Sequence, residues 1–258
     1  MEKKKEKKSF NKKKAALMAA AIIAAGGIGV GGAAAYFSAT SATKDNQITL
    51  VAGSADDNKG LDGTGAGKIE EDDWDKTGKD AAAKGLQPNA VVAKDPKLKS
   101  NVAYPSYVLA KVTVPKVSAT LNAGETLAPH EIVTLSNRAD GSKGTVAAPD
   151  IASDWVLVDE TNNDTAHTYY FAYTKELAPG AETSEIFQTI KVPNFRQVDL
   201  GKAAGGKSVD KKVFDVDVRA AMIQTEGYEK ASDTNKDTYK NTTTYQTLRT
   251  AVDAAEKK

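Results

Sequence analysis

The segment KVFDVDVRAAMIQTEG, residues 212–227, has the clearest two-residue periodicity of the chain. Apolar residues occupy every second position and charged residues stand between them: Phe214, Val216, Val218, Ala220 and Met222 against Asp215, Asp217 and Arg219. A helix would scatter these charges around its axis, whereas successive residues of a strand face opposite sides of a sheet. The segment is therefore predicted to be a strand with one face on a core.

Further strands are predicted on either side of the middle of the chain. AYPSYVLAKVTVPKV, residues 103–117, alternates in the same way and is expected to end at Pro115. DWVLVDE (154–160) and HTYYFAYTK (167–175) are joined by the turn-rich ETNNDTA and are expected to form a hairpin. QITLVA (47–52) has a strand-like mixture of β-branched and apolar residues.

Only the last stretch, TYQTLRTAVDAAEKK (244–258), suits a helix. Its apolar positions Tyr245, Leu248, Val252 and Ala255 fall three and four residues apart. Many short strands separated by turns predict an all-β fold, an antiparallel jelly-roll or Ig-like β-sandwich with long loops and a short C-terminal helix.

The N-terminus has the pattern of an export signal. MEKKKEKKSFNKKK carries eight lysines and two glutamates, and residues 15–35 carry no charge. The apolar segment is rich in alanine and glycine, which favours a signal peptide over a retained membrane anchor, although its length permits either. Ala33 and Ala35 form an A-x-A pattern, so cleavage is expected between Ala35 and Tyr36.

The chain that remains after residue 35 is acidic. It carries 27 basic and 32 acidic residues, a net charge near −5, whereas the whole chain has a net charge of +1. This net negative charge gives no support for a nucleic-acid partner, because nucleic-acid binding requires a basic patch. Cysteine is absent, so disulfides and thiolate metal sites are excluded.

The predicted organisation has five parts along the chain. They are a signal peptide (1–35), an N-terminal mature strand (36–53), a flexible acidic and glycine-rich loop (54–80), a β-sandwich body (81–230) and a partly helical C-terminal tail (231–258).

Motifs for catalysis are incomplete. His130 and Glu131 begin an HExxH pattern, but Thr134 stands where the second histidine ligand would be. His167 lies among aromatic residues in a predicted strand, and the calcium-loop-like DTNKD at 233–237 lacks the later glycine and glutamate. No serine sits in a GxSxG elbow. We therefore assign no catalytic, cofactor-binding or metal-ligating residue and expect a protein that is not an enzyme.

Several stretches resemble the TasA/camelysin family. GGAAAYFSATSATKDNQITLVAG (31–53) is similar to its SipW-type signal and mature start. LQPNAVVAKDPKLKSN (86–101), YPSYVLAKVTVP (104–115), TKELAPGAETSEIFQTIKVPNF (174–195) and FDVDVRAAMIQTEGY (214–228) are similar to its later strands and connections. Asn89 stands where the family has a turn glycine, and asparagine also tolerates a positive φ.

The resemblance implies an exported, jelly-roll-like protein of a Gram-positive bacterium. Such a protein contacts the membrane transiently through its signal, is processed by a SipW-type signal peptidase, and self-associates into biofilm matrix fibres or coats the cell surface. Some relatives carry a metallopeptidase label, which the missing HExxH does not support here.

The N-terminal strand suggests how fibres would form. After cleavage it is free to complete a neighbour's sheet, with Phe37, Ile48, Leu50 and Val51 entering the neighbour's core. Repetition of this head-to-tail contact gives a filament. The alternatives are a strand that pairs within its own sandwich, and a monomeric adhesin that binds a partner through loops 54–80 and 136–150.

Overall fold

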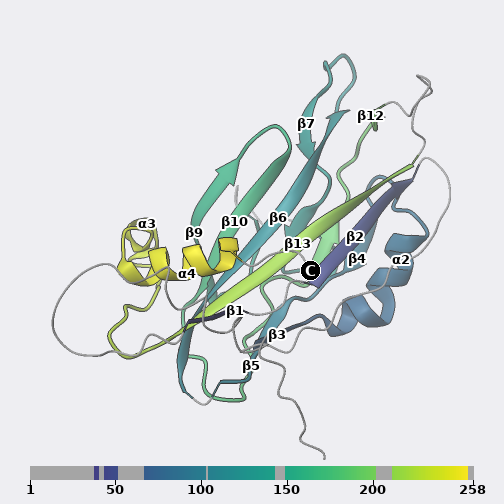
Figure 1. Ribbon diagram of the computed structural model, residues 1–258. Helices are drawn as coiled ribbons and strands as arrows, with labels where there is room; N and C mark the ends of the chain where they lie inside the picture. The colour runs from purple at the N-terminus through teal and green to yellow at the C-terminus, as the bar shows by residue number, and fades with distance from the viewer. Residues whose placement is uncertain are drawn as a thin grey trace, which may run out of the picture. The chain divides into compact units, whose positions relative to one another are not determined.

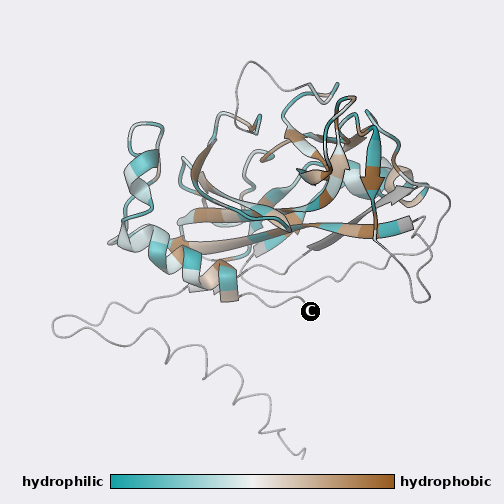
Figure 2. Ribbon diagram, turned by 90° about the horizontal axis from the view of Figure 1, so that it is seen from above, coloured by the Kyte–Doolittle hydropathy of each residue, from teal (hydrophilic) through white to brown (hydrophobic). Residues whose placement is uncertain are grey.

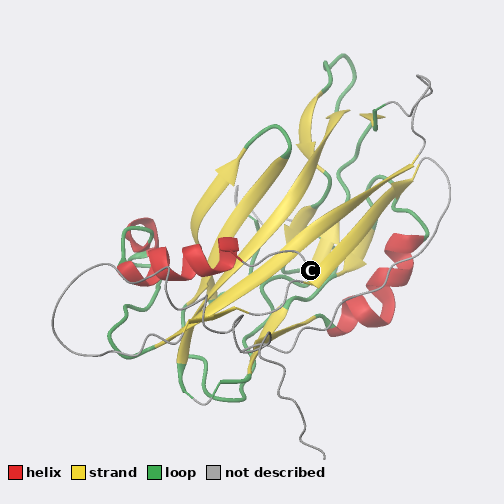
Figure 3. Cartoon of the chain, viewed as in Figure 1, coloured by secondary structure: helices red, strands yellow, loops and turns green. Residues whose placement is uncertain are grey.

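The computed structural model of the protein describes residues 38–40, 44–51, 67–102, 104–142, 149–201 and 211–254. These residues belong to one compact unit, Tyr36–Lys258. Antiparallel strands make up most of its regular structure, and a short helix follows the last strand, as predicted (Figure 1, Figure 3). No helix within these ranges is long and apolar enough to cross a membrane.

One large sheet organises the unit. Its strands are β1 (Ser38–Thr40), β2 (Lys44–Val51), β6 (Ser106–Thr120), β7 (Ala128–Glu131), β9 (Trp155–Asn162), β10 (Ala166–Tyr173), β12 (Gln197–Asp199) and β13 (Lys211–Gln224). The order across the sheet is β1-β13-β6-β10-β9, with β2 also on β13 and with β7 and β12 on β6. The long strands β13 and β6 therefore form its centre (Figure 1).

Two smaller sheets and a helical segment complete one side. The three-stranded sheet has the order β4 (Val91–Ala93), β11 (Thr189–Lys191), β8 (Thr134–Ser136), and the two-stranded sheet pairs β3 (Gly67–Glu70) with β5 (Lys97–Ser100). A π-type helical turn, η1 (Trp74–Gly78), continues into α2 (Lys79–Ala83).

The alternation that opened the sequence sorts the side chains of β13 between two cores. Phe214, Val216, Val218, Ala220 and Met222 are buried in the larger core together with residues of the two small sheets. Ala221 and Ile223, on the alternate face, belong to a second core. Both faces of the large sheet are therefore covered, which is why the strand reads as apolar on both faces toward its C-terminal end.

The C-terminal helix α4 (Thr243–Ala254) provides most of the cover for the second core, and the short α3 (Lys236–Tyr239) precedes it. The predicted apolar face of α4 is confirmed, because Tyr245, Leu248 and Val252 are at most 1% exposed. Ala255 lies outside the described residues. Figure 2 shows α4 against the side of the large sheet that faces away from the small sheets.

Two expectations about the boundaries of elements are wrong. Pro115 does not end its strand, because β6 continues to Thr120. Up to Pro115, β6 pairs with β10, and from Lys116 onward it pairs with β7. The carbonyl of Pro115 accepts a hydrogen bond from Ile132 N at 3.0 Å. The proline, which has no N–H to donate, therefore lies at the position where the partner strand changes. The loop expected over 54–80 is regular structure from Gly67 onward, and residues 52–66 lie outside the described residues.

The tight turn before β4 tests the prediction for Asn89. This residue has φ +66°, and its Nδ2 donates to Asn194 Oδ1 at 3.0 Å. We expect Asn89→Ala to lower the free energy of unfolding by about 1 kcal/mol, because a Cβ without a compensating polar group is disfavoured in the left-handed region. Asn89→Gly should stay near the wild type in urea denaturation. A larger loss for glycine than for alanine would contradict the backbone explanation.

Candidate functional site at the N-terminal strand

The N-terminal strand forms one edge of the large sheet. β2 pairs antiparallel with the first half of β13, from Lys44 opposite Val218 to Val51 opposite Lys211. β1 pairs with its second half, from Ser38 opposite Ile223 to Thr40 opposite Ala221. In Figure 1, β2 (dark blue) runs alongside β13 (yellow-green). Of the two alternatives, the strand here pairs within its own chain.

The two halves of this strand have different registers. Three residues separate Thr40 from Lys44, whereas only Arg219 and Ala220 separate their partners on β13. Residues 41–43, which join the two paired segments, lie outside the described residues. The edge therefore consists of two separately paired segments.

The register also gives the main-chain partners of the predicted donor residues. Ile48 stands opposite Phe214, Leu50 opposite Lys212 and Val51 opposite Lys211. The side chains of these three donor residues lie outside the described part of the structure, so their place in a core stays a prediction. Phe37 and the cleavage site at Ala35 and Tyr36 lie outside the described residues.

The same edge also has acidic residues at opposed positions of the register. Asp45 stands opposite Asp217, and Gln47 stands opposite Asp215. Asp217 is only 6% exposed, and its Oδ2 accepts from Arg219 Nε at 2.7 Å. The register therefore places two aspartates at opposed main-chain positions of this edge.

The other edge of the sheet, β9, is poorly suited to pairing with another strand. Its register with β10 shifts between Tyr170 and Phe171, so that Val158 has no Cα partner and forms a bulge. Asp159 is held by α4, with Tyr245 Oη donating to it at 2.6 Å. Bulges and charged residues are the usual protections of an open edge. The β9 edge is therefore protected against pairing with a further strand.

A polar cluster fixes α4 to the sheet. Arg249 Nη1 donates to Asp159 Oδ2 at 2.7 Å, and Lys111 Nζ donates to Asp253 Oδ1 at 2.6 Å. Burial disfavours the ionised form of Asp253, but hydrogen bonds from Lys111 and Arg249 outweigh it and leave the pKa of Asp253 below its usual value. The helix is therefore joined to β6 and β9 by charges as well as by apolar contacts.

The histidines occupy strands and not a metal-binding helix. His130 and Glu131 are neighbours on β7, so their side chains leave opposite faces. His167 of β10 lies between two carboxylates: its Nδ1 is 2.7 Å from Glu131 Oε1 and its Nε2 is 3.1 Å from Glu160 Oε2. Tyr169 Oη also donates to Glu131 at 2.7 Å, and burial together with that carboxylate raises the pKa of Tyr169. This network joins three strands and was missed from the sequence.

A buried ion pair lies beneath η1. Lys94 Nζ is 2.7 Å from Glu71 Oε1, both side chains are completely buried, and the ammonium lies 4.8 Å from the centre of the Trp74 ring. Asp95 Oδ1 accepts from the main-chain N–H groups of Asp73 and Trp74 at 3.0 Å. In the sequence these residues appear as the triplet KDP, residues 94–96, and nothing in that triplet indicates that the lysine is buried.

The acidic residues at 70–73 and the calcium-loop-like DTNKD segment make structural contacts. Glu71 forms an ion pair with Lys94, and Asp72 accepts a hydrogen bond from Lys97 Nζ at 3.0 Å. At 233–237, Asn235 Oδ1 accepts from Ser232 N at 2.8 Å, and the chain then enters α3. Among residues whose side chains the structure describes, no group of three or more histidine, aspartate or glutamate side chains is arranged to hold a metal ion.

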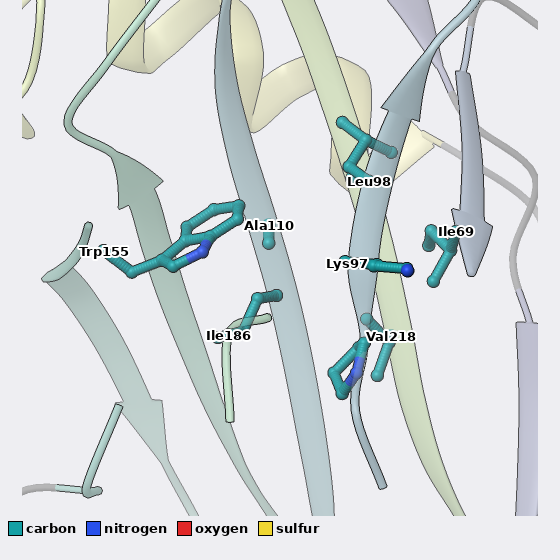
Figure 4. Close-up of a pocket in the computed structure, with 9 residues that line it drawn as sticks. Ile69, Lys97, Leu98, Ala110, Trp155, Ile186 and Val218 are labelled. Carbon is teal, nitrogen blue, oxygen red and sulfur yellow. The ribbon is translucent and has the colours of Figure 1, made fainter. Parts of the chain in front are cut away.

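A small apolar cavity lies between the two-stranded sheet and the large sheet (Figure 4). Its walls include Ile69, Leu98, Trp155, Ile186 and Val218. Lys97 is also part of the lining, but its ammonium is engaged by Asp72 and Glu182. The cavity therefore lacks the convergent polar groups of a ligand site.

Comparison of the chain with protein-family models, with curated proteins and with solved structures gives no significant match.

Proposed function

We propose that this protein is an exported structural protein that self-associates into extracellular matrix fibres or a cell-surface layer, in the manner of the TasA/camelysin family. The sequence supports this through its signal-like N-terminus, its acidic remainder and the family-like stretches at 31–53, 86–101 and 214–228. The observation that carries the proposal is the pairing of β1 and β2 as an edge strand on β13. At the finer level, we propose a jelly-roll-like β-sandwich.

The assembly step would be exchange of the N-terminal strand between copies. The 15 residues between Val51 and Gly67 join it to the body, and a fully extended segment of that length reaches about 50 Å. The strand of one copy can therefore occupy the place beside β13 of the next copy in the same register, with Ile48 opposite Phe214 and Leu50 opposite Lys212. If each copy receives its strand from one neighbour and gives its own strand to another, the head-to-tail contact repeats without closing.

Deletion of the strand tests whether it is needed for assembly. We expect the secreted chain to form filaments visible by electron microscopy and a variant lacking residues 36–53 to remain unassembled, because its β13 edge has no strand to receive. The control variant keeps residues 36–53 and carries the substitutions Thr161→Ser and Thr165→Ser in and next to β9. Equal filament formation with and without residues 36–53 would contradict the proposal. A chain that stays monomeric at high concentration would instead favour the alternative function, a monomeric adhesin.

Cysteine pairs distinguish pairing within a chain from pairing between chains. The chain has no cysteine, and Thr49 stands opposite Val213, which is 44% exposed. We expect a mixture of the single variants Thr49→Cys and Val213→Cys to give disulfide-linked dimers in filaments, since only strand exchange brings the two residues together. In monomers, the double variant should close within one chain. Absence of mixed dimers in filaments would exclude exchange in this register.

A further inference from the structure

An amine and a carboxyl group are in direct contact in the interior beneath η1. Lys94 Nζ lies 2.7 Å from Glu71 Oε1, both side chains are completely buried, and the Trp74 ring lies beside the ammonium. Next to Lys94, η1 packs so closely on β4 that a Cβ added at Gly78 would stand 2.2 Å from the carbonyl oxygen of Ala93. The pair is therefore held in a closely packed place away from solvent.

The main chain holds both residues in this contact. Lys94 N donates to the carbonyl of Gln188 at 2.9 Å, which fixes the residue at the end of β4. The carbonyl of Glu71 accepts from Asp75 N at 2.9 Å, in the turn that enters η1. Two groups that are held at contact distance react far faster than the same groups free in solution. The arrangement therefore favours a reaction between them.

The carboxylate of Glu71 is only partly satisfied by its surroundings. Its Oε2 is buried and has no hydrogen-bond partner among the described residues. The desolvation cost of two buried ions can exceed their attraction unless further hydrogen bonds satisfy the remaining oxygens. An amide between the two side chains would carry no charge and would keep only one of the two carboxyl oxygens. Both sources of instability would then disappear.

Asp95 is the other carboxylate next to Lys94 in the sequence, but its oxygens are engaged elsewhere. Both of them accept from Asp73 N at 3.0 Å, and Oδ1 also accepts from Trp74 N at 3.0 Å. These hydrogen bonds hold Asp95 against the main chain at the start of η1. The 2.7 Å contact of Lys94 Nζ therefore selects Glu71 as the acceptor.

We propose that Lys94 and Glu71 form an intramolecular isopeptide bond, and that the ion pair is the reactant state of this cross-link. One proton passes from Nζ to the carboxylate along the 2.7 Å contact, which gives a neutral amine and a carboxylic acid. The Nζ lone pair then attacks Cδ of Glu71, and an electron pair of the carbonyl moves onto its oxygen.

The second half of the reaction releases water. A second proton passes from Nζ to the hydroxyl oxygen, the carbonyl re-forms, and the bond from Cδ to that oxygen breaks. One C–N bond thus replaces one C–O bond, and Nζ keeps one hydrogen as an amide N–H. No atom is oxidised or reduced, so the two side chains need no further reactant.

The cross-link would lie where the N-terminal strand joins the body. Residues 52–66 connect β2 to β3, and Glu71 follows β3 directly. In filaments formed by strand exchange, tension between copies would enter each body through this connection, and the bond would pass it on to the end of β4. This mechanical role rests on the proposed function, whereas the bond itself forms within a single chain.

Intact-mass measurement of the purified folded protein, sprayed from denaturing solvent, tests the bond. We expect a mass lower by one water molecule than the sequence mass for the N-terminus that the protein has. Lys94→Met should have its full sequence mass, because it lacks the nucleophile. Lys99→Met is the matched control: Lys99 is paired with Glu182 at 2.9 Å but is 40% exposed, so this variant should still lose one water.

Tryptic digestion locates the bond. Trypsin cuts after an unmodified lysine, so an unmodified Lys94 should separate residues 85–94 from residues 95–97. With the bond in place, that cut is blocked and residues 69–76 are joined to residues 85–97. The wild type decides the test by itself, so a Lys94→Met variant that fails to fold does not weaken it.

A folded wild type with its full sequence mass would overturn the proposal. A water loss that maps elsewhere would overturn it as well, for example at Asp140, because an aspartate followed by glycine can lose water by cyclisation. The two proposals also fail separately. Cross-linked chains that never form filaments would refute the assembly function and keep the bond, whereas filaments of full-mass chains would refute the bond and keep the assembly function.

Discussion

Replacement of Lys94 by methionine is expected to lower the free energy of unfolding by about 3–5 kcal/mol, the cost of breaking a buried ion pair on one side. Lys94 and Glu71 are both fully buried, with 2.7 Å between Nζ and Oε1. The other carboxylate oxygen of Glu71 already has no hydrogen-bond partner among the described residues. Removal of the ammonium would leave the whole carboxylate buried without compensation. Urea denaturation followed by tryptophan fluorescence measures the loss, with Trp74 next to the site.

The double variant Glu71→Leu/Lys94→Met separates a lost charge pair from lost packing. Because both charges disappear together, it should be more stable than Lys94→Met alone, by about 2 kcal/mol or more. Lys99→Met is the matched control: its side chain is 40% exposed in a pair with Glu182, so it should lose at most about 1 kcal/mol. If Lys94→Met is as stable as Lys99→Met, the buried ion pair contributes little to the stability of the fold.

Truncation of Leu248 to alanine is expected to cost about 3 kcal/mol. This side chain of α4 is completely buried in the second core, together with Leu109, Val156 and Ile223 of the large sheet. The loss has two causes, the transfer of the removed methyl groups and the cavity left between helix and sheet. Chemical denaturation of the purified protein measures this loss.

The control for Leu248→Ala is Thr250→Ala, two residues along the same helix at an exposed position. It should change the free energy of unfolding by less than about 0.5 kcal/mol, because surface substitutions outside special contacts are nearly neutral. Similar losses for the two variants would mean that the helix does not depend on its apolar face. A loss confined to Leu248→Ala establishes α4 as an integral part of the fold and not a loose tail.

Local periodicity predicted the elements that bury one face in a regular pattern. β13 follows from alternation, the β9–β10 hairpin from two aromatic and β-branched runs with a turn between them, and α4 from apolar spacings of three and four. In each case the pattern and the burial arise from the same geometry, so a single sequence contains the necessary information.

Contacts between distant segments were not predictable in this way. Glu71 and Lys94 read as ordinary surface charges, and only the packing of η1 on β4 buries them. β3 and η1 lie in a stretch whose glycines and aspartates indicate a loop, but pairing with β5 and burial of Trp74 outweigh that local preference. The main-chain pairing of Asp45 with Asp217 depends on the register of β2 and β13, which composition and spacing do not determine.

The one-residue offset between the registers of β1 and β2 would affect the rate of the strand exchange that we propose. A strand paired without interruption must break all its main-chain hydrogen bonds together before a competitor can occupy its place. Here the three residues of β1 can open while the eight of β2 stay paired, because the offset already separates the two runs. An incoming strand would first pair with residues 221–223 of β13 and then replace β2 along residues 211–218. The activation barrier of exchange would thus be divided into two smaller steps.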